Sequence, residues 1–296
     1  MPLVRRFYAS HGLSNDATDL IMASWRPGTK AQYSVYLKLW SKFFEDRKLP
    51  YRPTLKFGIE FLTFLFSEGY SYPQIAMARS ALSSVIVMNN ASEFTFGKHT
   101  LVKRLMKGIF EKRPTFPKFH FIWNVQTLFN YFRSLDHPAE LPMGILGKKL
   151  ALLIGIVAGG HRSQTLHAIR STEIKVLGDR CIIPIYEPIK QTRPGRHLKP
   201  LEFPVYLENP KLCVVENLKQ YLAKTSAIRQ HSQLFISYQK PHQPVSKDTL
   251  ARWCKQVLGL AGIDIDQYSA HSSRSATTFA RFYQKTIDKP FETHIL

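Results

Sequence analysis

"RCIIPIYEPIK" at residues 180–190 and "LKPLEFPVYL" at residues 198–207 are rich in β-branched and aromatic residues, in a chain that otherwise has helical periodicity. They flank "QTRPGRH" at 191–197, a polar turn that contains Pro194 and Gly195. The pattern predicts an antiparallel hairpin with a basic tip. Helical patterns at 125–135, 144–158, 212–225 and 246–260 surround it. We therefore expect helices around a small antiparallel sheet, an α+β unit.

The preceding part of the chain has helical patterns and no convincing strand. At 29–47, "TKAQYSVYLKLWSKFFEDR" has an aromatic and apolar face with i, i+3, i+4 and i+7 spacing, carried by Tyr33, Tyr36, Leu37, Trp40, Phe43 and Phe44. Further helices are expected at 13–25, with Ser14 as N-cap, and at 55–69, 71–90 and 98–114. An all-helical bundle is the natural architecture.

"RPTFPKFHF" at 113–121 is basic, has prolines and lacks periodicity, which is typical of a linker. We predict a helical domain at 1–113, a linker at 114–121 and an α+β domain at 122–296. The fold class is mainly α with a small antiparallel sheet.

The charge of the chain indicates a polyanionic partner. The 296 residues include 41 Lys and Arg against 21 Asp and Glu, a net charge of +20. Residues 1–118 contain 18 basic and 8 acidic residues, and residues 119–296 contain 23 and 13, so both parts carry the excess. Nucleic acid is the first candidate, because neutralising phosphates releases counterions and drives binding. A merely soluble basic protein is the alternative, and charge alone leaves it open.

Three cysteines, Cys181, Cys213 and Cys254, are far apart in the sequence and form no metal-binding motif. We expect reduced, mostly buried thiols in an intracellular protein, with no metal and no cofactor. The first residues lack the apolar region of a signal peptide, and no uncharged run is long enough to span a membrane.

Arg162 is the first candidate for phosphate chemistry. In "AGGHRSQTLHAIRSTEI" at 158–174, Gly159 and Gly160 end a buried helix and allow a tight turn before Arg162. A guanidinium at that position can bind a phosphate, or it can cap the carbonyl end of the helix. This segment alone leaves both interpretations open.

The hairpin supplies the next cations, Lys190, Arg193, Arg196 and Lys199. Taken alone, a basic hairpin tip is usually just solvated. A lysine there can, however, reach a groove and donate a proton to a leaving oxygen.

"HSSRSATTFARFYQK" at 271–285 contains His271 and Arg274, which share one helix face, and Tyr283. An ordinary amphipathic helix with a solvated face is one interpretation. The other is a phosphate site, in which arginines and a histidine stabilise the charge of a pentacoordinate transition state and a tyrosine hydroxyl attacks phosphorus. Such a covalent step needs neither ATP nor a metal.

Taken in order, these segments resemble the tyrosine recombinase (phage-integrase-like) family, and specifically the recombinases of DIRS-type retroelements. The similar segments are "SWRPGTKAQY", "ARSALSS", "GGHRSQTLH", "KQTRPGRHLKPLEFP", "LCVVENLKQYL", "LFISYQKPHQPVS" and "HSSRSA". They cover nearly the whole chain.

The resemblance implies a helical core-binding domain and a catalytic domain clamped around double-stranded DNA, in the nucleus, with oligomerisation on the DNA. It implies DNA cleavage through a 3′-phosphotyrosine. The implied catalytic residues are Arg162, Lys190, His271, Arg274 and Tyr283. We expect further DNA contacts from Arg193, Arg196 and Lys199 of the hairpin and from Lys103, Arg104 and Lys107 at 98–114.

Two features depart from the family pattern. Thr165 stands where many members have an acidic residue, three places after the first arginine. Arg274 and Tyr283 are only nine residues apart and lack the intervening Trp or His that contacts the phosphate in the family. In a continuous helix they would be about 13 Å apart along the axis and on different faces, so Tyr283 reaches the site only if the chain breaks near Thr277 and Thr278.

We infer an internal deletion, a skipped exon or a gene-model error, and an abbreviated catalytic domain. The leading hypothesis is a tyrosine recombinase impaired in catalysis. The alternatives are a catalytically dead DNA-binding protein derived from such an enzyme, and a polyanion-binding structural protein, which the ordered segments disfavour.

Overall fold

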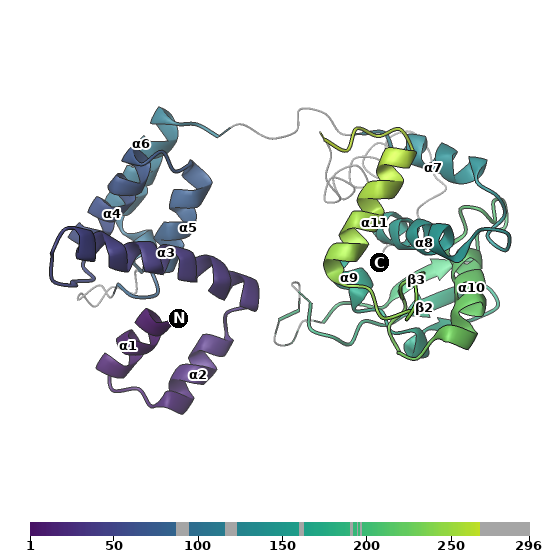
Figure 1. Ribbon diagram of the computed structural model, residues 1–296, viewed down its shortest axis with the longest axis horizontal. Coiled ribbons are helices and arrows are strands. Elements are labelled where there is room, and N and C mark those ends of the chain that lie inside the picture. The colour runs from purple at the N-terminus through teal and green to yellow at the C-terminus, as the bar shows by residue number, and fades with distance from the viewer. Residues whose placement is uncertain are drawn as a thin grey trace. The chain divides into compact units, whose positions relative to one another are not determined.

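The computed structural model describes residues 1–86, 95–115, 123–159, 163–189, 192–193, 195 and 197–266. The chain divides into two compact units, Met1–Pro117 and Lys118–Leu296 (Figure 1). Each unit has its own hydrophobic core, and no helix in the described part of the chain is long and apolar enough to cross a membrane.

Every secondary-structure element described in the first unit is a helix. Its elements are α1 (Pro2–Ser10), α2 (Asn15–Ala23), α3 (Pro27–Asp46), α4 (Leu55–Ser67), α5 (Tyr72–Leu82), the 3-10 turn η1 (Phe96–Lys98) and α6 (Thr100–Lys112). Ser14 caps α2 as predicted, because its side chain accepts a hydrogen bond from the Ala17 amide at 3.2 Å. Helix α1 was not predicted from the sequence, although Val4, Phe7 and Tyr8 have helical spacing and Val4 is fully buried.

The predicted aromatic face of α3 forms the centre of this core. Trp40 contacts Phe43, Phe44 and Phe61, with ring centroids 4.7–5.9 Å apart. The Trp40 indole donates a hydrogen bond to the Tyr51 hydroxyl at 3.2 Å, so its one polar atom has a partner. Leu37 is also buried, whereas Tyr33 and Tyr36 lie at the edge of the core.

The second unit packs helices around a three-stranded sheet. Its elements are α7 (Val125–Ser134), α8 (Met143–Val157), α9 (Ser163–His167), η2 (Ser171–Glu173), β1 (Lys175–Val176), β2 (Arg180–Ile183), β3 (Leu201–Pro204), α10 (Val214–Thr225), η3 (Ser226–Ile228) and α11 (Lys247–Leu260). The apolar helix α8 packs against α9, α10 and α11, and α10 packs against β3 (Figure 1).

The predicted antiparallel strand pair is confirmed, but its strands are shorter than expected. β2 pairs with β3, with Cys181 opposite Phe203, and β1 adds a short third strand at the other edge of β2. Pro184 follows β2 directly and Pro200 precedes β3 directly. Because proline cannot donate a ladder hydrogen bond, these residues bound the strands. The fold class, mainly α with a small antiparallel sheet, is confirmed.

All three cysteines are buried, free thiols, as expected. Burial raises the pKa of both Cys181 and Cys254 to about 12. These two thiols are therefore protonated and unreactive while the second unit is folded.

Candidate nucleic-acid interface

The five predicted catalytic residues lie outside the described residues, and so does Arg196. The catalytic set is Arg162, Lys190, His271, Arg274 and Tyr283. The structure does describe the segments that flank Arg162 and Lys190, and the remaining predicted DNA contacts. These flanking segments form the framework of the candidate site.

The chain turns sharply where α8 leads toward Arg162. Gly159 has a φ of +94°, a left-handed conformation that residues with a side chain rarely adopt, and its amide bonds to the Ile156 carbonyl at 3.0 Å. This confirms the predicted glycine turn at the end of a buried helix. Beyond residues 160–162, α9 begins at Ser163, and Thr165 and Leu166 anchor it in the core. Thr165, which replaces the acidic residue of the family pattern, is therefore an interior position.

The segment before Lys190 is also anchored. Ile189 is buried, its amide donates to the Thr192 hydroxyl at 3.1 Å, and the Thr192 amide donates to the Ile189 carbonyl at 3.0 Å. Two hydrogen bonds thus join residues on either side of 190–191.

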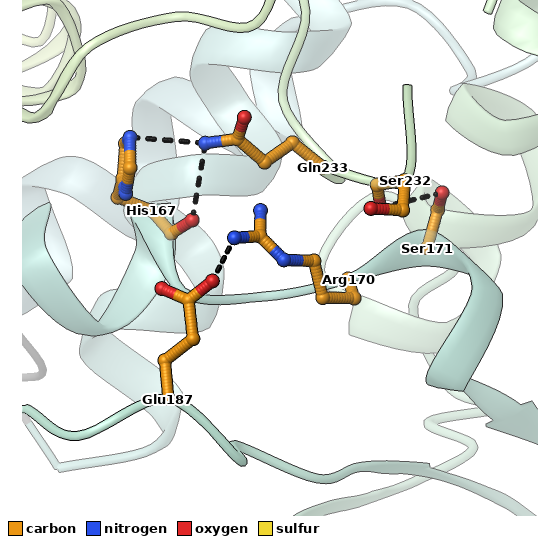
Figure 2. A network of polar contacts seen from close by, with 6 residues as sticks. All are labelled: His167, Arg170, Ser171, Glu187, Ser232 and Gln233. Carbon is orange, nitrogen blue, oxygen red and sulfur yellow. Dashed lines mark hydrogen bonds and ion pairs between the residues drawn. The ribbon is translucent and has the colours of Figure 1, made fainter. Parts of the chain in front are cut away.

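A network of polar contacts links these flanking segments (Figure 2). The guanidinium of Arg170, which follows α9, forms an ion pair with the carboxylate of Glu187, on the segment that leads to Lys190. The Gln233 amide nitrogen donates to the His167 ring at 2.9 Å and lies 3.5 Å from the His167 carbonyl oxygen. The network therefore joins segments 167–171, 185–189 and 232–234.

His167 takes part in this network as a neutral ring. Burial lowers its pKa, and the charges of Lys247 and Arg170 lower the pKa further. The Nε2 atom can then accept the Gln233 hydrogen bond, which a protonated ring cannot do.

The backbone supports the same arrangement. The Leu234 amide donates to the Ile169 carbonyl at 3.0 Å, and the Ser171 amide and hydroxyl both donate to the Ser232 carbonyl, at 2.6 and 3.0 Å. This network was not predictable from the sequence, because its members are far apart in the chain and form no motif.

Arg193 and Lys199, of the predicted basic tip, are both exposed. The Arg193 guanidinium donates to the Thr192 carbonyl at 3.0 Å. Their contacts with DNA stay a prediction from the sequence.

In the first unit, α6 has one apolar face and one basic face. Val102, Met106 and Ile109 are buried, whereas Lys103, Arg104 and Lys107 are exposed. No ion pair engages these three cations among the described residues. The face is therefore available to a polyanion.

Arg113 fixes the end of α6 against α4. Its guanidinium donates to the Tyr70 carbonyl at 2.7 Å and to the Phe66 carbonyl at 3.2 Å, and it stacks 4.4 Å from the Phe66 ring centroid. These contacts satisfy carbonyls at the end of α4 and orient the helix that carries the basic face.

Replacing Lys103, Arg104 and Lys107 with glutamine should weaken duplex DNA binding and reduce its salt dependence. Each phosphate contact contributes about 0.9 to the slope of log K against log salt, so three lost contacts should reduce the slope by between 2 and 3. A gel-shift or fluorescence titration at several salt concentrations measures this slope. In the control, glutamine replaces the exposed Lys38, Lys42 and Lys56 of the same unit. This control removes as many positive charges as the α6 variant does. Equal slopes in both triple variants would contradict an interface on α6.

No family model matches the sequence, and no curated protein matches it. Among solved structures, the Tn1549 transposon integrase in complex with transposon right end DNA matches with a TM-score of 0.55 and 12% identity, over 96% of this chain and 88% of that one. The chain has the tyrosine recombinase fold.

Two structures of XerH site-specific recombinase, one bound to difH substrate and one to palindromic difH substrate, also match this fold. The post-cleavage complex matches with a TM-score of 0.54 and 16% identity, over 87% of this chain and 69% of that one. The pre-cleavage complex matches with a TM-score of 0.52 and 14% identity, over 87% and 70%. The likeness establishes the fold, and the DIRS-type subgroup stays a prediction from the sequence.

Proposed function

We propose that this chain binds double-stranded DNA as a site-specific tyrosine recombinase. The observation that carries the proposal is the tyrosine recombinase fold. The match to a DNA-bound integrase that has this fold covers 96% of the chain. Sequence motifs in the family's order and exposed cations on α6 and the hairpin support it.

In the proposed reaction, the Tyr283 oxygen attacks a DNA phosphorus and the bond from phosphorus to the 5′-oxygen breaks. The product is a 3′-phosphotyrosine, which retains the bond energy for rejoining. Lys190 protonates the departing 5′-oxygen, and the tyrosine proton passes to solvent. Arg162, His271 and Arg274 stabilise the charge on the non-bridging oxygens. No metal and no cofactor take part.

The finer proposal is that this chain cleaves DNA poorly. The nine-residue spacing from Arg274 to Tyr283, without an intervening Trp or His, supports it. The same observation favours the alternative function, a catalytically dead DNA-binding protein derived from a DIRS-type retroelement recombinase. A nuclear location and oligomerisation on DNA belong to the proposal in either case.

The test is a pool of nicked duplexes of randomised sequence that traps the covalent intermediate. We expect little 3′-phosphotyrosine adduct from the unaltered chain and none from Tyr283→Phe, because phenylalanine lacks the nucleophilic oxygen. Denaturing gels of labelled DNA detect the adduct. Abundant adduct from the unaltered chain would contradict the impairment, and adduct from Tyr283→Phe would contradict the choice of nucleophile.

A further inference from the structure

Helix α7 is held to the second unit mainly by apolar side chains. Val125, Leu128 and Phe132 are buried in the core of this unit. Among the described residues, one hydrogen bond joins α7 to a segment distant in the sequence, from the Lys211 ammonium to the Arg133 carbonyl at 3.0 Å. Figure 1 shows α7 at the margin of the unit, apart from β2 and β3. The docking of α7 therefore depends on what its buried side chains meet.

One of these side chains covers a buried charge. Lys149, on α8, is 1% exposed, and the centroid of the Phe132 ring lies 5.8 Å from its nitrogen. This ammonium has no hydrogen-bond partner in the part of the chain that the structure describes. The distance is close to the limit of about 6 Å for a cation–π contact, so the ring replaces little of the lost hydration. Docking of α7 thus buries the Phe132 ring but keeps water from Lys149.

The electrostatic balance at Lys149 opposes the docking of α7. Burial, with the charge of Lys211 as a smaller cause, lowers the pKa of Lys149 from 10.5 to about 8. The surroundings therefore disfavour the ammonium, and the attraction of the Phe132 ring does not offset the loss of hydration. A lowering of this size corresponds to a factor on the order of 100 in an equilibrium that returns the ammonium to water.

We propose that α7 is a strap that opens before the rest of the second unit unfolds, and that the buried charge of Lys149 favours this opening. An isolated helix of 10 residues is marginal in water, so the open strap also unwinds. An unwound segment reaches up to about twice as far as the same residues in a helix. Because α7 is the first helix described in the second unit, the strap sets the reach of the connection from the first unit.

Hydrogen–deuterium exchange of the full chain at pH 7, followed by mass spectrometry of its peptides, tests the strap. In the unaltered chain, the amides of α7 should exchange faster than those of α8, α10 and α11, whose exchange requires wider unfolding. Lys149→Met should slow the exchange of α7 by at least about tenfold, because opening then no longer returns an ammonium to water. Methionine is close to lysine in length and packs well against an aromatic ring.

Lys148→Met is the matched control for the loss of one charge from α8. Lys148 is only partly buried, and its nitrogen lies 5.2 Å from the Tyr238 ring centroid, outside α7. The exchange of α7 in this variant should stay within about twofold of the unaltered chain, because the ammonium of Lys148 already meets water. Equal slowing by Lys148→Met and Lys149→Met would mean that net charge, and not the buried ammonium, controls α7.

Two further results would overturn the strap. If α7 exchanges no faster than α10 and α11 in the unaltered chain, then α7 opens only when the whole unit unfolds. If Lys149→Met slows exchange in α10 and α11 but leaves α7 unchanged, then Lys149 stays buried when α7 opens. The measurement is made without DNA, so its outcome does not depend on the proposed function.

Discussion

Replacing Lys149 with methionine is expected to stabilise the unit Lys118–Leu296 by about 3 kcal/mol at pH 7. Lys149 lies on α8 and is only 1% exposed, and its ammonium has no hydrogen-bond partner in the described part of the chain. The Phe132 ring centroid is 5.8 Å from its nitrogen. Burial, with the charge of Lys211 as a smaller cause, lowers the pKa of Lys149 from 10.5 to about 8.

The sign of this effect follows from the two protonation states. At pH 7 the amine is charged in both the folded and the unfolded chain, so the folded unit bears the full cost of burying it. Between pH 8 and pH 10.5 the unfolded chain binds more protons at this site, so this contribution to stability rises with pH. The advantage of Lys149→Met should therefore shrink over this range and disappear near its upper end.

The unfolding of this unit can be measured through the reactivity of its buried thiols. All three cysteines lie in the second unit, so pulsed alkylation during urea unfolding reports on that unit alone. The unfolding free energies of the unaltered chain and Lys149→Met should be compared at pH 7 and pH 9.5. Lys148→Met is the matched control, because Lys148 neighbours it on α8 but is only partly buried, with its nitrogen 5.2 Å from the Tyr238 ring centroid. Its effect should stay within about 1 kcal/mol. A Lys149→Met advantage that is the same at both pH values would contradict the assignment to the buried charge.

Arg162→Ala and Arg274→Ala should each reduce the rate of adduct formation on nicked DNA by on the order of 100-fold or more. Each guanidinium is proposed to stabilise charge that develops in the transition state. DNA binding should fall much less, because many other cations of this basic chain contact the backbone. The rate is measured by single-turnover accumulation of adduct, and the affinity by titration of the same duplex. Equal losses in rate and affinity would mean that both arginines are ordinary phosphate anchors.

The elements whose formation depends on nearby residues were predictable from the sequence. The N-cap at Ser14, the buried face of α3 around Trp40 and the glycine turn at Gly159 each follow from residues within a few positions of one another. The pairing of β2 with β3 also followed from local composition, although Pro184 and Pro200 shorten the strands. Within the candidate site, the exposed cations of α6 follow from helical periodicity.

The sequence alone determined that the chain has a helical unit and an α+β unit. It also determined the net charge and the order of the candidate catalytic residues. Only the tertiary structure brought Arg170 to Glu187 and Gln233 to His167, because these partners are 17 and 66 residues apart and no periodic pattern joins them. Tertiary packing likewise decided that Lys149 is fully buried while Lys148 beside it is only partly buried. Helix α8 is surrounded by α7, α9, α10 and α11. The environment of Lys149 therefore depends on segments that are distant in the sequence. Local rules predict which element a residue joins, and long-range packing decides what its side chain meets.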